Sequence, residues 1–151
     1  MKQTTENTLQ IMLADDDKDD RFFFRELIEE INEDIMMTEF EDGELLTEFL
    51  KQIDEPPPPH MIFLDINMPR KSGIECLREI RSNKNYCTVP IIMFTTSSNT
   101  RDIDDSYNCG ANLFIRKAYS FVEGMTTLRA VFHDFRTSSL IGIPKDHYFK
   151  G

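Results

Sequence analysis

The sequence has only three cysteines, and it lacks both an apolar leader and a long apolar run. Cys76, Cys87 and Cys109 are widely spaced and form no CxxC pair, which argues against a disulfide framework and against a zinc site. Residues 1–10 are polar, so they do not follow the pattern of a signal peptide. No apolar run approaches the roughly 18 residues that a membrane-spanning helix needs. We therefore expect a reduced, cytoplasmic protein.

Basic residues are outnumbered: 17 lysines and arginines stand against 27 aspartates and glutamates, and the net charge is -10. The phosphate backbone of a nucleic acid repels such a chain, and so does an anionic membrane surface. Cations and small basic partners are attracted instead. The composition thus predicts no nucleic-acid partner and no membrane partner.

Short apolar runs alternate with amphipathic segments along the 151 residues. The runs typical of strands cover residues 11–14, 35–40, 61–64, 91–94 and 113–115. Helical spacing follows each run, over residues 19–31, 44–53, 73–83, 100–108 and 121–135. This alternation predicts an α/β fold, a doubly wound parallel sheet of five strands with five helices on its two faces.

One domain is expected to take up most of the chain. Its predicted limits are residues 9–135, with residues 1–8 as an N-terminal extension and residues 136–151 as a C-terminal tail. Pro56–Pro59 favour extended backbone, and we interpret them as a stiff surface connection rather than a docking site for a proline-reading partner. Whether the tail docks on the domain or on a neighbouring molecule is left open.

Polar residues follow the predicted strands at the point where each strand ends. Asp15 and Asp16 follow the first strand, Asp65 the third, Thr95 the fourth and Lys117 the fifth. In an open parallel sheet the carboxyl ends of the strands share one edge, and ligands bind there. We therefore expect these five side chains to lie close together, although they are scattered along the chain.

Carboxylates gathered at one edge repel one another unless a positive charge lies between them. Mg²⁺ prefers oxygen ligands and commonly takes one or two carboxylates together with phosphate oxygens. Lys117 adds a point charge suited to a phosphoryl group, and the hydroxyl of Thr95 is a donor for a phosphoryl oxygen. A metal seat, a carboxylate nucleophile and a supporting cation together suit phosphoryl transfer.

Four segments carry a family resemblance: residues 13–17 (LADDD), 63–69 (FLDINMP), 91–95 (IIMFT) and 114–117 (FIRK). In this order and spacing, with Gly73 after the third-strand segment, they resemble the receiver domain of two-component response regulators. The resemblance covers about residues 9–135 and implies a flavodoxin-like sheet of order 2-1-3-4-5. The chain is similar in pattern to bacterial single-domain regulators of the chemotaxis type. It also resembles in part the single-domain regulators that partner phytochrome-type kinases.

The resemblance implies a phosphoacceptor and a metal site. Asp65 looks like the phosphoacceptor, and Asp16 and Asp65 look like direct Mg²⁺ ligands. Asp15 would act mostly through water, and Asn67 would add its backbone carbonyl. The phosphoryl group would come from a phosphohistidine on a sensor kinase or phosphotransfer protein. The domain would modify and restore only its own Asp65, and so would not be an enzyme in the usual sense.

The resemblance also implies a switch. Lys117 would pair with Asp65 and then with the phosphoryl group, Thr95 would follow that group, and Phe114 would swing inward behind Thr95. A buried aromatic is also an ordinary core residue, so both interpretations of Phe114 stay open. The output would be protein contact without an attached output domain, with a homodimer as one possible form.

Two residues depart from the family pattern. Ala118 stands where the family has a proline after the lysine. Because a cis bond before a non-proline residue costs about 2.5–4 kcal/mol, we expect a trans or strained Lys117–Ala118 bond and a different loop. Thr96 stands where alanine or glycine is usual, and its larger side chain would narrow access to the phosphoryl group.

Other interpretations compete with these. Asp17 or Asp19 is suited to capping the first helix, and Asp19 and Asp20 fit a solvated helix start. An Mg²⁺-dependent aspartyl phosphatase would need a general acid two residues after its nucleophile, where this chain has Asn67. A receiver-like interaction module that no longer uses phosphorylation is a further alternative, which Ala118 slightly favours.

Overall fold

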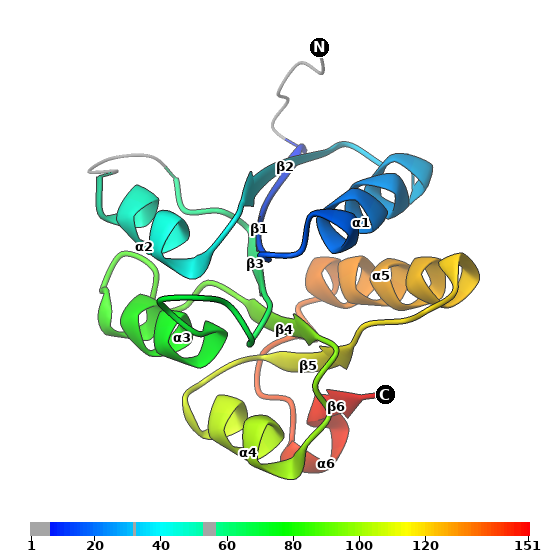
Figure 1. Cartoon of the computed structure of the whole chain (residues 1–151). Helices are drawn as coiled ribbons and strands as arrows, with labels where there is room; N and C mark the ends of the chain where they lie inside the picture. Colours follow the sequence, from blue (N-terminus) through cyan, green and yellow to red (C-terminus); the bar gives the residue numbers. More distant parts are fainter. Residues whose placement is uncertain (1–6, 32, 53–56) are drawn as a thin grey trace.

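The computed structural model describes residues 7–31, 33–52 and 57–151. Along the chain the elements are β1 (Leu9–Ala14), α1 (Lys18–Ile31), β2 (Ile35–Phe40), α2 (Gly43–Gln52), β3 (Met61–Leu64), α3 (Gly73–Ser82), β4 (Ile91–Thr95), α4 (Thr100–Asn108), β5 (Leu113–Arg116), α5 (Phe121–Arg136), α6 (Lys145–Tyr148) and β6 (Phe149–Lys150). The strands form one parallel sheet in the order β2-β1-β3-β4-β5-β6 (Figure 1). The predicted α/β class is confirmed, and the predicted order holds for the first five strands. Ile53, the predicted end of the second helix, and Pro56 lie outside the described residues.

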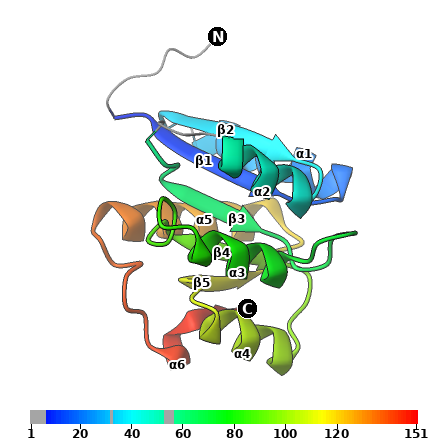
Figure 2. The ribbon, with the colours of Figure 1, turned by 90° about the vertical axis from the view of Figure 1, so that its left-hand side faces the viewer.

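The sheet separates two cores, with α1 and α5 covering one face and α2, α3 and α4 the other (Figures 1 and 2). β3 contributes to both cores, because successive side chains of a strand point to opposite faces. Ile62 and Leu64 pack toward α2 and α3, whereas Met61 and Phe63 pack toward α1 and α5. All four side chains are fully buried, as expected for a central strand of a parallel sheet.

The start of α1 is fixed by Asp17, which matters because this helix borders the carboxyl edge of the sheet. A carboxylate oxygen of Asp17 accepts hydrogen bonds from the backbone N–H groups of Asp19, at 2.8 Å, and Asp20, at 3.1 Å. These donors have no partner within the helix, and a carboxylate cap satisfies them. Of the two predicted caps, Asp17 is therefore the one that the structure shows.

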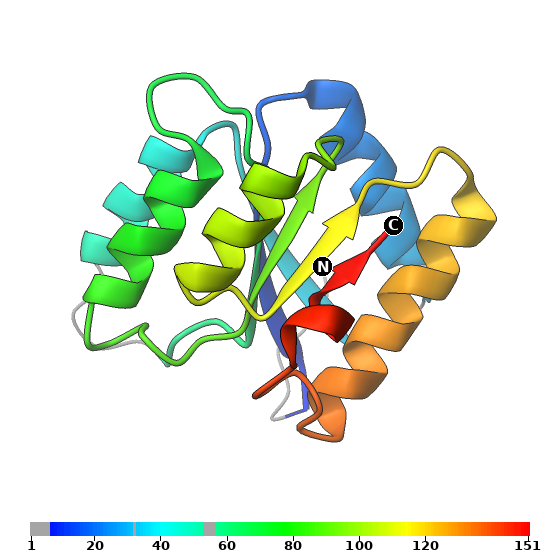
Figure 3. The ribbon, with the colours of Figure 1, turned by 90° about the horizontal axis from the view of Figure 1, so that it is seen from below.

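The chain after α5 forms regular structure, which corrects the predicted count of five strands and five helices. α6 leads into β6, and β6 pairs in parallel with β5, so that Phe149 lies beside Phe114 (Figure 3). Tyr148 is fully buried in the core that α2, α3 and α4 cover. A helix of four residues and a strand of two are too short for hydrophobic periodicity to reveal.

Candidate functional site

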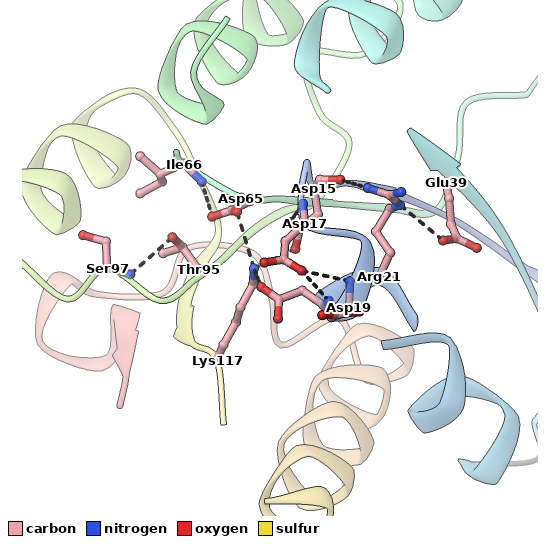
Figure 4. A network of polar contacts seen from close by, with 11 residues as sticks. Asp15, Asp17, Asp19, Arg21, Glu39, Asp65, Ile66, Thr95, Ser97 and Lys117 are labelled. Atoms are coloured by element: carbon pink, nitrogen blue, oxygen red, sulfur yellow. Dashed lines mark hydrogen bonds and ion pairs between the residues drawn. The ribbon is translucent and has the colours of Figure 1, made fainter. Parts of the chain in front are cut away.

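Three buried side chains meet at the carboxyl ends of β1, β3 and β5. The backbone N–H of Asp65 donates to the carbonyl of Ala14, at the end of β1, and Asp15 follows Ala14 directly. The ammonium nitrogen of Lys117, just after β5, lies 2.6 Å from a carboxylate oxygen of Asp15 and 3.4 Å from one of Asp65. Figure 4 shows the three side chains pointing toward one another. Parallel strands thus bring residues from three parts of the chain into one site.

A cluster of carboxylates forms the centre of this site. Asp15, Asp16 and Asp65 each offer one oxygen, and these oxygens all lie within 4.8 Å of one another. Asp15 and Asp65 are buried, whereas Asp16 is exposed. Three carboxylate oxygens at this spacing, one of them open to solvent, fit a hard divalent cation that keeps part of its water shell. Asn67 is exposed in the loop between β3 and α3, two residues beyond Asp65.

Asp65 is held in place through both of its carboxylate oxygens and through its backbone. Oδ1 accepts a hydrogen bond from the backbone N–H of Ile66 at 2.8 Å, and Oδ2 faces Lys117. The backbone of Gly73, at the start of α3, passes so close that a Cβ atom there would lie 2.1 Å from the carbonyl oxygen of Asp65. Only glycine allows this approach, which explains the place of Gly73 in the sequence pattern.

Burial and charge shift the proton affinities of the site in opposite ways. Burial raises the pKa of the Asp15 carboxyl to about 6, although the hydrogen bond from Lys117 acts against that rise. Burial alone would lower the pKa of Lys117, but the charge of Asp65 and hydrogen bonds to Asp15 and Asp20 outweigh it and hold that pKa above its usual value. Lys117 is therefore a permanent cation among carboxylates.

Asp20 belongs to the site, which corrects its interpretation as part of a solvated helix start. A carboxylate oxygen of Asp20 lies 2.8 Å from the ammonium nitrogen of Lys117. Asp19, by contrast, is exposed, as expected. No local pattern in the sequence marks Asp20, because its contact with Lys117 joins residues that are 97 positions apart.

Thr95, which is predicted to respond to a phosphoryl group, ends β4, the strand between β3 and β5 in the sheet. Thr95 is fully buried at the end of β4, and its side-chain oxygen accepts a hydrogen bond from the backbone N–H of Ser97 at 3.3 Å. Thr96, the next residue, is exposed. No peptide bond is cis in the described parts of the chain, so the Lys117–Ala118 bond is trans, one of the two predicted forms.

Phe114 is a residue of β5, three positions before Lys117. Its side chain packs on the opposite face of the sheet from that of Ile115. Its ring is fully buried, with its centroid 6.2 Å from that of Tyr148 and 5.7 Å from that of Phe149. Phe114 is therefore inside the core in this structure, in contact with the C-terminal segment.

No helix among residues 7–31, 33–52 and 57–151 has both the length and the apolar character to cross a bilayer.

Comparisons with known proteins agree with this geometry. A family model described as the response regulator receiver domain matches residues 11–129. Response regulator Rcp1 of Synechocystis sp. is 33% identical over 111 residues, which are 72% of this chain and 76% of Rcp1. The solved structure of the phosphorylated cyanobacterial phytochrome response regulator RcpA is 26% identical, with a TM-score of 0.78, and the match covers 87% of this chain and 96% of that chain. The Mn(2+)-bound form of Rcp1 is 28% identical, with a TM-score of 0.73 and coverage of 90% and 97%. The chain belongs to the response regulator receiver domain family.

Proposed function

We propose that this chain accepts a phosphoryl group on Asp65 from a phosphohistidine of a sensor kinase or phosphotransfer protein, in the presence of Mg²⁺. The observation that carries the proposal is the buried pair of Asp65 and Lys117 beside the carboxylates of Asp15 and Asp16. In this arrangement Asp65 would be the nucleophile, the carboxylates would hold the metal, and Lys117 would supply the cation. The modified domain would then signal by contact with another protein.

The transfer exchanges one bond to phosphorus for another. A carboxylate oxygen of Asp65 attacks the phosphorus, and the bond from phosphorus to the histidine nitrogen breaks. The electron pair of that bond stays with the imidazole, and the product is an acyl phosphate. Lys117, 3.4 Å from Asp65, is placed to donate to an oxygen of the arriving group. Hydrolysis of the acyl phosphate restores Asp65.

The proposed metal ligands are Asp16, Asp65 and the carbonyl of Asn67, with Asp15 acting through water. When bound there, Mg²⁺ would offset the negative charge of the carboxylates and of the phosphoryl oxygens. The acidic cluster supports this assignment. So does the Mn(2+)-bound form of the relative Rcp1.

The proposed response to phosphorylation involves Thr95, Thr96 and Phe114. The hydroxyl of Thr95 would donate to the phosphoryl group, and the exposed side chain of Thr96 would narrow the approach to it. The ring of Phe114 is already buried in this structure and packs on the rings of Tyr148 and Phe149. A movement of the Phe114 ring would therefore alter its contacts with both of these residues.

Exposed apolar side chains beside the site support a protein as the phosphoryl donor. Tyr119 and Val122, in and after the loop that follows Lys117, are 86% and 74% exposed, and Phe22 on α1 is 56% exposed. The rings of Phe23 and Phe121 are 6.0 Å apart and join α1 to the start of α5. Apolar surface of this kind, next to a reaction site, suits a protein partner.

The test is the intact mass of the protein after incubation with Mg²⁺ and acetyl phosphate. We expect a gain of one phosphoryl group, and we expect no gain in Asp65→Asn or in the parent protein with a chelator. No gain in the parent under any condition would contradict the proposal and favour a phosphorylation-independent interaction module. Turnover of a small phosphomonoester would favour an aspartyl phosphatase.

A further inference from the structure

Lys117 has three carboxylate partners in the described structure, and they hold it unequally. Its ammonium nitrogen lies 2.6 Å from Asp15, 2.8 Å from Asp20 and 3.4 Å from Asp65. An ammonium group has three N–H donors, so each donor has one carboxylate to bind. The contact with the proposed phosphoacceptor is the longest of the three. The cation is thus held closer to Asp15, just after β1, and to Asp20, on α1, than to Asp65.

A phosphoryl group on Asp65 would compete for one of these donors. Asp15 cannot give up Lys117 easily, because its side chain is 1% exposed and water would not replace the lost contact. The side chain of Asp20 is 37% exposed, so it can turn into solvent at little cost. Asp20 is therefore the partner that Lys117 would leave.

We propose that Asp20 is a positioning residue. It holds the ammonium of Lys117 toward α1 and thereby lowers the affinity of the site for a phosphoryl group. This inference rests on the function proposed above. It assigns to Asp20 no contact with the metal or with the phosphoryl group. Within residues 7–31, 33–52 and 57–151, the carboxylates that cluster closely enough to share an ion are those of Asp15, Asp16 and Asp65.

The test compares the affinity of the protein for beryllofluoride, a phosphoryl mimic, at saturating Mg²⁺ by calorimetry. We expect Asp20→Asn to bind it about two- to fivefold more tightly than the parent protein, the range for an ion pair with one exposed member. Asp19→Asn is the matched control, since it removes the same charge from the same helix start and Asp19 is not among the partners of Lys117 in the described structure. Asp20→Glu keeps the charge and should restore the affinity of the parent.

A second readout separates positioning from a general effect of charge. Without beryllofluoride, Mn²⁺ affinity should change equally in Asp20→Asn and Asp19→Asn, because neither residue belongs to the carboxylate cluster. Equal beryllofluoride affinity in these two variants, or weaker binding by Asp20→Asn than by Asp19→Asn, would overturn the role of Asp20. If the parent itself does not bind beryllofluoride more tightly than Asp65→Asn, the proposed function and this inference both fail. If the parent does and only the Asp20 effect is missing, the function stands alone.

Discussion

β5 takes part in two contrasting regions of the molecule. At its carboxyl end, Lys117 lies among the carboxylates of Asp15, Asp20 and Asp65, and the contacts are ionic. Within the strand, Phe114 packs on the rings of Tyr148 and Phe149, and these contacts are apolar. The first region consists of charged side chains at the edge of the sheet, and the second consists of aromatic rings that pack on one another.

The two regions differ in what they contribute to stability. Ionised groups that are buried together lose hydration, and their mutual attraction offsets that loss only in part. The rings of the C-terminal segment bury apolar area, which stabilises a fold with no such penalty. Contacts of two different kinds thus meet along one strand, and their contributions can be compared by removing a single partner from each side.

The largest effect is expected at the ionic end. Lys117→Gln leaves the buried carboxylates of Asp15 and Asp65 without their cation, which should lower the free energy of unfolding by about 3–5 kcal/mol without added metal. Mg²⁺ should recover part of this loss, because it would bind the vacated carboxylates more tightly. Urea titrations with and without Mg²⁺ measure both changes. Lys18→Gln, at an exposed position on α1, is the control, and an equal effect in the two variants would contradict the prediction.

A smaller effect, independent of metal, is expected on the apolar side. Tyr148→Ala removes a fully buried ring and should lower the free energy of unfolding by about 2–3 kcal/mol. This loss is smaller than that for a ring in the middle of a chain, because the terminal segment can detach locally. Urea titrations should give the same loss with and without Mg²⁺. Phe149→Ala, whose ring is 39% exposed, should lose less. If Tyr148→Ala lowered the free energy of unfolding by less than Phe149→Ala does, the C-terminal segment would not pack as described.

The smallest effect concerns one hydrogen bond of that segment. The hydroxyl groups of Ser106 and Tyr148 are 2.7 Å apart in a buried position between α4 and α6. Ser106→Ala and Tyr148→Phe should each cost about 0.5–1.5 kcal/mol, and the double variant should cost less than their sum because both remove the same bond. Additive losses in thermal unfolding would show that the bond does not contribute.

The ionic region could be predicted from the sequence, except for one residue. Asp15, Asp16, Asp65 and Lys117 each follow an apolar run, and a parallel sheet must bring such positions to one edge. Asp20 was missed because a run of acidic residues at a helix start is ordinarily solvated. Its role depends on how far the long side chain of Lys117 reaches toward α1, and no local pattern encodes that reach.

The apolar region could not be predicted, for a different reason. Phe114 was assigned either to the core or to a switch, and nothing near it in the sequence indicates Tyr148 as its neighbour. The segment that carries Tyr148 is too short for periodicity, and it is placed by a tertiary contact with β5. The two-residue strand β6 forms because β5 is available as a partner, and the propensities of its two residues alone do not predict a strand.

The central claim is that Asp65 receives the phosphoryl group, and the most direct measurement is to locate that group. Borohydride reduces an acyl phosphate and leaves homoserine in place of the modified aspartate, so peptide mass spectrometry after acetyl phosphate treatment identifies the position. We predict homoserine at position 65 alone, and none when Mg²⁺ is chelated. Homoserine at position 15 or 16, or at no position in a protein that has gained a phosphoryl group, would contradict the account.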